Sequence, residues 1–125
     1  MKSFLFRRRE KSKSLGNKDI IAQKTVKLVL ETWKEGNMEK LYHLTQKSWR
    51  TKHTFNNFDI FKIEDYSIDK IEFETDVMFD AFVELKIPDQ PVTNKYLIKF
   101  VAERKPYITD PKADFGFNPI TMRIL

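Results

Sequence analysis

Residues 77–87 have the sequence Val-Met-Phe-Asp-Ala-Phe-Val-Glu-Leu-Lys-Ile, in which every odd-numbered position is apolar. The positions between them are Met78, Asp80, Phe82, Glu84 and Lys86. Because successive side chains of a strand point to opposite faces, this alternation predicts a long strand with one dry face and one mixed face. We expect the odd positions to face the core and the even ones to face solvent or a partner. A shift of one residue would reverse every position.

Two further strands are predicted beside this one. They span residues 66–74 and 95–104, where β-branched and aromatic residues recur. Thr75-Asp76 is a plausible turn before the long strand, and the Pro88-Asp89-Gln90-Pro91 segment ends it. In the third strand, Leu97 and Val101 indicate that the second face of the sheet is partly covered.

The end of the chain is predicted to be a loop followed by a fourth strand. The loop spans residues 106–119, with turn chemistry at Asp110-Pro111 and at residues 115–119. Its aromatic residues are interpreted either as a lid over the sheet or as an anchor into a neighbour: Tyr107, Phe115 and Phe117. The fourth strand contains Ile120, Met122 and Ile124.

Two helices are predicted ahead of the strands. Residues 18–35 have helical periodicity, with Asn17 as the N-cap and Gly36 as the residue that ends the helix. Asn37 then caps a second helix, from Met38 to about Trp49. The apolar face of the first helix consists of Ala22, Val26, Val29, Leu30 and Trp33. We expect Trp33 to be buried against the sheet. The next segment, residues 55–61, is either a single helical turn or an irregular aromatic bridge.

Composition excludes several classes of protein. The chain has 125 residues, of which 41% are hydrophobic, and this length favours a single domain. There is no cysteine, so disulfides and thiolate chemistry are excluded, and two histidines argue against a structural zinc site. No apolar stretch approaches the ~20 residues of a membrane-spanning helix. We therefore expect no cofactor, no metal and no transmembrane segment.

The net charge of +5 is concentrated at the N-terminus. We divide the chain into a basic arm, residues 1–16, and a single α+β domain, residues 17–125. The arm contains one acidic residue, Glu10, and these basic residues: Lys2, Arg7, Arg8, Arg9, Lys11 and Lys13. They suit contact with the phosphates of RNA or DNA or with anionic lipid heads, and the alternative is a solvated tail. The arm does not resemble a secretory signal, while mitochondrial targeting stays open.

The pattern Val26-(x)6-Trp33-Lys34-Glu35-Gly36-Asn37-(x)3-Leu41 resembles the first two helices of the nuclear-transport-factor-2-like superfamily, the cystatin-like α+β cone. The order of the later strands is also similar, and the resemblance covers about residues 18–125. It implies two helices packed on a curled, four-stranded, mostly antiparallel sheet. The superfamily includes isomerases, dehydratases, transport adaptors, secretion-system parts and ribosome-associated domains, so the fold does not assign an activity.

One hypothesis is a small-molecule-binding enzyme of the isomerase or dehydratase type. Catalytic branches similar to ketosteroid isomerase use an Asp base, often with His or Tyr, and the weak candidates here are His43, Tyr66 and Asp80. Asp80 lies on the mixed face of its strand, however, and His43 is interpreted as a half-buried packing residue. The sequence contains no carboxylate pair and no phosphate-cradling glycine loop.

The favoured hypothesis is a non-enzymatic adaptor or structural subunit of a larger assembly. Met78 and Phe82 lie on the mixed face, where exposed apolar residues more often mark a protein contact than a base-stacking platform. A virion, a ribonucleoprotein particle or a membrane-associated machine would suit such a protein, inside a cell or in a virion. A homo-oligomer is also compatible with this pattern.

Overall fold

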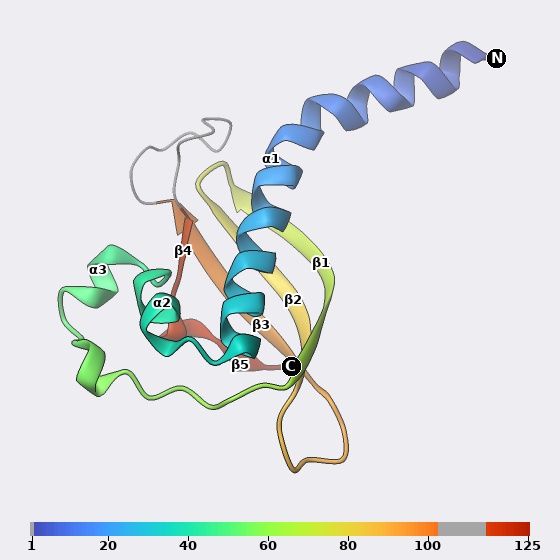
Figure 1. Cartoon of the computed structure of the whole chain (residues 1–125). Helices are drawn as coiled ribbons and strands as arrows, with labels where there is room; N and C mark the ends of the chain where they lie inside the picture. The colour runs from blue at the N-terminus through green and yellow to red at the C-terminus, as the bar shows by residue number, and fades with distance from the viewer. Residues whose placement is uncertain (1, 103–114) are drawn as a thin grey trace.

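The computed structural model describes residues 2–102 and 115–125, with side chains from Asp19 onward except that of Ile120 (Figure 1). The helical elements are α1 (Lys2–Glu35), α2 (Met38–His43), α3 (Lys47–Arg50) and two 3-10 turns, η1 (Phe55–Asn57) and η2 (Pro119–Thr121). The strands are β1 (Asp65–Thr75), β2 (Met78–Lys86), β3 (Asn94–Ala102), β4 (Phe115–Phe117) and β5 (Arg123–Ile124). The described residues thus form an α+β fold.

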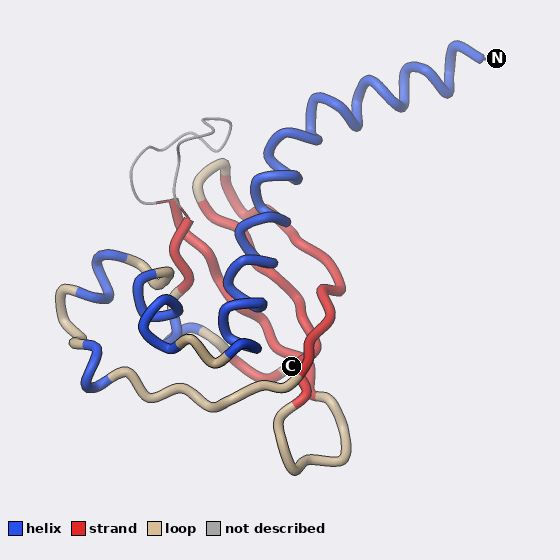
Figure 2. Tube along the Cα trace, in the orientation of Figure 1, coloured by secondary structure: helices blue, strands red, loops and turns tan. Residues whose placement is uncertain are grey.

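The strands form one open antiparallel sheet in the order β1-β2-β3-β4 (Figure 2). The short strand β5 also pairs with β3, at Tyr96 and Leu97, while β4 pairs with the other end of β3. The sheet therefore contains five described strands rather than the four expected. Two short strands can share one edge of β3 because the η2 turn separates them.

Helix α1 lies across one face of this sheet, which we call the inner face (Figure 1). Its predicted apolar stripe is confirmed, because each of these five residues is at most 1% exposed: Ala22, Val26, Val29, Leu30 and Trp33. They pack with the inward residues of β2, which are all fully buried: Phe79, Ala81, Val83 and Leu85. Burying each large side chain contributes about 1.5–3 kcal/mol. The predicted sidedness of β2 is confirmed, since its even positions are all partly exposed.

The joint between the helices also follows the prediction. Gly36 has a φ of +80°, a conformation that glycine adopts without steric cost. The side chain of Asn37 accepts a hydrogen bond from the backbone N–H of Lys40 at 3.2 Å and so caps α2.

The predicted start of the first helix and the predicted extent of the second helix were wrong. The backbone of α1 is already helical at Lys2, so Asn17 is not its N-cap. Most residues before Gly16 favour helix, and Gly16 and Asn17 do not interrupt the helix. The second predicted helix is divided after His43. There Thr45 forms a β-bridge with Phe117, and its hydroxyl donates to the Tyr42 carbonyl.

The C-terminal segment differs most from the prediction. Phe115 and Phe117 are neither a lid nor turn residues; they belong to β4 and are 7% and 0% exposed. Phe117 stays in place because its backbone exchanges hydrogen bonds with Leu44 and Gln46. The last strand is shorter than expected, and Ile124 is 65% exposed. The predicted Tyr107 contact and the Asp110-Pro111 turn lie outside the described residues.

Candidate functional site

The face of the sheet opposite α1, which we call the outer face, carries the predicted contact residues. The β2–β3 register places Met78 opposite Val101 and Phe82 opposite Leu97. Between these apolar pairs, Asp80 lies opposite Lys99. The outer face is therefore a ladder in which apolar and oppositely charged pairs alternate, and cross-strand pairs of both kinds stabilise a sheet.

Phe82 is the centre of this ladder, and it is less exposed than the sequence suggested. Both Met78 and Phe82 are half-buried. Leu97, which flanks Phe82, is only 8% exposed, and the Lys70 ammonium lies 4.7 Å from the centroid of the Phe82 ring. Lys70 also pairs with Glu72 at 3.2 Å. The Phe82 ring is thus partly covered by Lys70, whose ion pair with Glu72 borders it.

Ion pairs connect three strands beside the apolar pairs. Lys99 on β3 contacts Glu74 on β1 and lies 3.2 Å from the Asp80 carboxylate on β2. The hydrogen bond from Lys99 lowers the pKa of Glu74, and the same bond raises the pKa of Lys99. Next to them is an open groove of about 450 Å³, whose lining includes Leu97, Met122 and Arg123.

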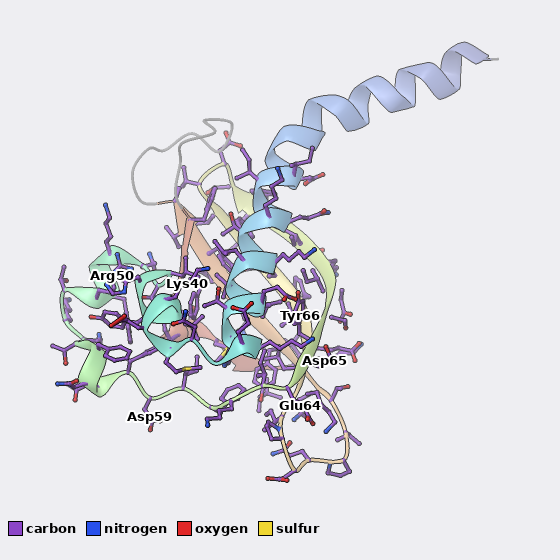
Figure 3. All side chains as sticks on the ribbon, in the orientation of Figure 1. Lys40, Arg50, Asp59, Glu64, Asp65 and Tyr66 are labelled. Atoms are coloured by element: carbon purple, nitrogen blue, oxygen red, sulfur yellow. The ribbon has the colours of Figure 1, made fainter. Side chains whose placement is uncertain are left out.

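The three candidate catalytic residues are not brought together. Asp80 lies on the outer face, whereas Tyr66 points to the inner side, where its hydroxyl donates to the Glu31 carboxylate on α1 (Figure 3). His43 is exposed on α2, rather than half-buried as expected, and its Nδ1 donates to the Glu39 carbonyl at 2.9 Å.

Tyr66 is also poorly suited to act as a base. Burial, followed by its hydrogen bond with Glu31, raises the pKa of Tyr66 to about 12. The phenol therefore stays protonated at neutral pH and serves as a link between α1 and β1.

The space between α1 and the sheet is filled by side chains. The largest of these are fully buried or nearly so: Trp33, Phe79, Phe100 and Phe117. The Phe79 and Phe100 rings stack with centroids 4.9 Å apart, and Trp33 donates through Nε1 to the Phe61 carbonyl at 2.7 Å. Between these rings the inner face is a packed core.

Sequence reasoning found only half of the outer face. It named Met78 and Phe82, and it placed Leu97 and Val101 on the second face of the third strand. It did not pair these residues across the strands, and it did not name Lys99. The information was available, because Leu97, Lys99 and Val101 have the parity opposite to the buried Tyr96, Ile98 and Phe100. Only the register, which the sequence did not specify, brings them beside Met78 and Phe82.

The basic arm has a helical backbone from Lys2 onward. Six of its side chains lie outside the described ones: Lys2, Arg7, Arg8, Arg9, Lys11 and Lys13. Within the described part of the chain, no helix is long and apolar enough to cross a membrane. The same part contains no group of three or more acidic or histidine side chains placed to hold a metal ion.

Comparisons with protein-family models, with curated proteins and with solved structures find no match to this chain. The resemblance to the nuclear-transport-factor-2-like superfamily therefore stays a prediction.

Proposed function

We propose that this chain is a non-enzymatic adaptor or structural subunit of a larger assembly, and that it docks on a protein partner through its outer face. The observation that carries the proposal is the asymmetry of the sheet. Helix α1 covers the inner face, whereas the outer face keeps the apolar pairs Met78–Val101 and Phe82–Leu97 within a polar rim. A small apolar centre with polar surroundings is the usual anatomy of a protein interface.

The charges of the outer face favour a protein over a nucleic acid. Its cations and anions pair with one another, as Lys70 does with Glu72 and Lys99 with Glu74 and Asp80. Little net charge is left to attract phosphates, which dominate nucleic-acid affinity. The partner that fits is a protein surface with an apolar side chain to place between Phe82 and the groove lined by Leu97 and Met122.

We also propose that residues 1–13 bind an anionic surface of the assembly. The support is the sequence itself, because this segment carries the whole net charge of +5 and the remaining residues are formally balanced. Arginine forms bidentate hydrogen bonds with phosphate, so the Arg7-Arg8-Arg9 run suits nucleic acid or anionic lipid. A virion, a ribonucleoprotein particle or a membrane-associated machine would offer both surfaces.

Site-specific photo-crosslinking tests the docking face. Phe82 is replaced by benzoylphenylalanine in the full chain, expressed in the cells or particles from which the protein comes. The control carries the same group at Val92, which is 62% exposed in the loop between β2 and β3. We expect one defined protein adduct from position 82 and none from position 92.

Binding to the purified partner then gives the quantitative check. Phe82→Asp should weaken binding at least about tenfold, whereas Val92→Asp should leave it unchanged. The proposal is contradicted if position 82 gives no adduct or if both positions give the same set. An adduct between two copies of the chain would instead identify the outer face as a homo-oligomer interface.

A further inference from the structure

A second hollow lies on the helical side of the molecule, away from the outer face. It has a volume of about 240 Å³ and is lined by residues of α1, of the α2–α3 segment and of β4, the elements labelled in Figure 1. Leu28 and Val29 line it from α1, Phe115 lines it from β4, and His43, Lys47 and Arg50 line it from the α2–α3 segment. We call it the helical cleft.

The charge around the helical cleft is one-sided. No acidic side chain contributes to its described lining. Residues 38–53, which form this wall, contain one acid, Glu39, and four Lys or Arg residues: Lys40, Lys47, Arg50 and Lys52. This segment therefore has a net charge of +3 within residues 14–125, which as a whole are formally balanced. A concave low-dielectric wall strengthens its positive potential.

Arg50 is held with its guanidinium at the cleft. Its Nη1 donates to the His43 carbonyl at 3.0 Å and also to the Thr45 carbonyl, at the end of α2. A guanidinium carries five N–H donors, so these two contacts leave donors for an anion. The His43 ring is oriented through its Nδ1, which donates to the Glu39 carbonyl. In the neutral imidazole Nε2 is then an acceptor, so the donors to an anion come from Arg50.

The other wall is apolar. Val29 and Phe115 are almost fully buried, and Leu28, which is 43% exposed, offers apolar surface to a ligand in the cleft. A site with donors on one side and an apolar surface on the other suits a ligand that has both characters. The volume limits that ligand to a small molecule.

We propose that the helical cleft binds small organic anions, in which a carboxylate or phosphate group is held by Arg50 and an apolar substituent lies on Leu28. The proposal is independent of the outer face and of the proposed adaptor function. The proposal assigns no catalytic role to Arg50, because binding requires no nucleophile or base.

Titration of the full chain, followed by two-dimensional ¹H–¹⁵N NMR, tests the proposal. The probes are phenyl phosphate and benzoate, with benzyl alcohol as the neutral control. Both anions should cause saturable shifts of the Thr45, Lys47 and Gly116 amides, with a dissociation constant on the order of 1 mM. Benzyl alcohol should bind at least about tenfold more weakly, since it lacks the anionic group.

Two substitutions on α1 provide a matched pair. Leu28→Glu places a negative charge at the cleft, whereas Ile20→Glu makes the same change at a residue that is 51% exposed and does not line it. Leu28→Glu should weaken anion binding at least about tenfold through charge repulsion, and Ile20→Glu should not change it. Thermal melts of both variants confirm that the fold is retained.

A third variant separates the cleft from the basic arm. Replacing Arg7, Arg8 and Arg9 by glutamine should leave the affinity for both probes unchanged. The proposal is overturned if no saturable shifts occur, if benzyl alcohol binds as tightly as the anions, if Leu28→Glu and Ile20→Glu behave alike, or if the arm variant loses binding.

Discussion

At the scale of single residues, Trp33 makes the contact that joins the helical layer to the segment entering the sheet. It is 1% exposed, its ring centroid is 5.2 Å from that of Phe61, and its Nε1 donates to the Phe61 carbonyl. Trp33→Ala should lower the free energy of unfolding by about 3–5 kcal/mol in urea denaturation. Trp33→Phe keeps much of the apolar volume but leaves the carbonyl unpaired, so a smaller loss is expected. An alanine variant of nearly unchanged stability would contradict this placement.

Tyr66 gives a prediction about pH at the same scale. Its pKa is raised to about 12, first by burial and then by the hydrogen bond with Glu31. Because the folded state holds this proton more tightly than the unfolded state, stability should fall as the pH rises from about 10 to about 12. The tyrosinate absorbance of the wild type minus that of Tyr66→Phe isolates this group from Tyr96, whose pKa burial also raises.

Glu31→Gln is the control for that titration. It removes the charge beside the phenol but leaves the burial, which is the larger cause. The Tyr66 pKa should therefore move down only part of the way toward 10. A full return to the ordinary value would show that burial contributes little.

At the scale of elements, strand β2 contributes side chains to both faces of the sheet. Phe79 is fully buried on the inner face, whereas Phe82 is half-buried on the outer face. The same chemical change should thus have unequal effects: Phe79→Ala should cost about 3–5 kcal/mol of stability, and Phe82→Ala about 1 kcal/mol. Urea unfolding measures both. Equal losses would mean that the sidedness of β2 has been assigned wrongly.

The ion pairs that link β1, β2 and β3 predict the behaviour of the sheet in acid. The pKa of Glu74 is lowered, mainly by the hydrogen bond from Lys99. As the pH falls, the unfolded state takes up this proton first, so the stability from the pair is lost as the pH falls through the folded pKa. Glu74→Gln should flatten this part of the stability profile.

Lys99→Met provides the second half of a double-mutant cycle. It should make the stability depend less on pH over the same range. Adding Glu74→Gln to it should change the stability little more, because the interaction is already lost. Additive effects of the two substitutions would show that they act independently.

The elements differ in how far the sequence determines them. Residues 77–87 specified their strand and its faces because a period of two over eleven positions leaves no other arrangement. The Gly36-Asn37 joint was also predictable, since local chemistry decides it. The β4 strand was not, because Phe115-Gly116-Phe117 becomes a strand only through distant partners, Phe100 and Thr45. The helical cleft was missed for the same reason: Leu28, His43 and Phe115 meet only in the folded chain.

At the scale of the whole molecule, the proposed contact surfaces lie in different places. The inner face is filled, the outer face is apolar and charge-balanced, the α2–α3 wall of the helical cleft is cationic, and the largest positive charge lies in the first 13 residues. Separate surfaces of this kind allow one chain to contact several partners at the same time. This arrangement is one reason why we propose a subunit of an assembly.

The basic arm can be removed to test this separation. Helix α1 starts at Lys2, and among its described side chains, those from Asp19 onward, the fully buried ones begin at Ala22. We therefore expect deletion of residues 1–13 to leave the body folded with a similar melting temperature. If the arm contacts nucleic acid, the deletion should abolish most of the affinity for single-stranded RNA. Binding by the full chain should weaken with salt, with a log–log slope of about −0.7 per phosphate neutralised for single strands, or about −0.9 for duplex DNA. Anionic vesicles distinguish lipid from nucleic acid, because their binding does not respond to nuclease. A truncated chain that binds its anionic partner as tightly as the full chain, across the whole salt range, would show that the arm does not contribute to recognition.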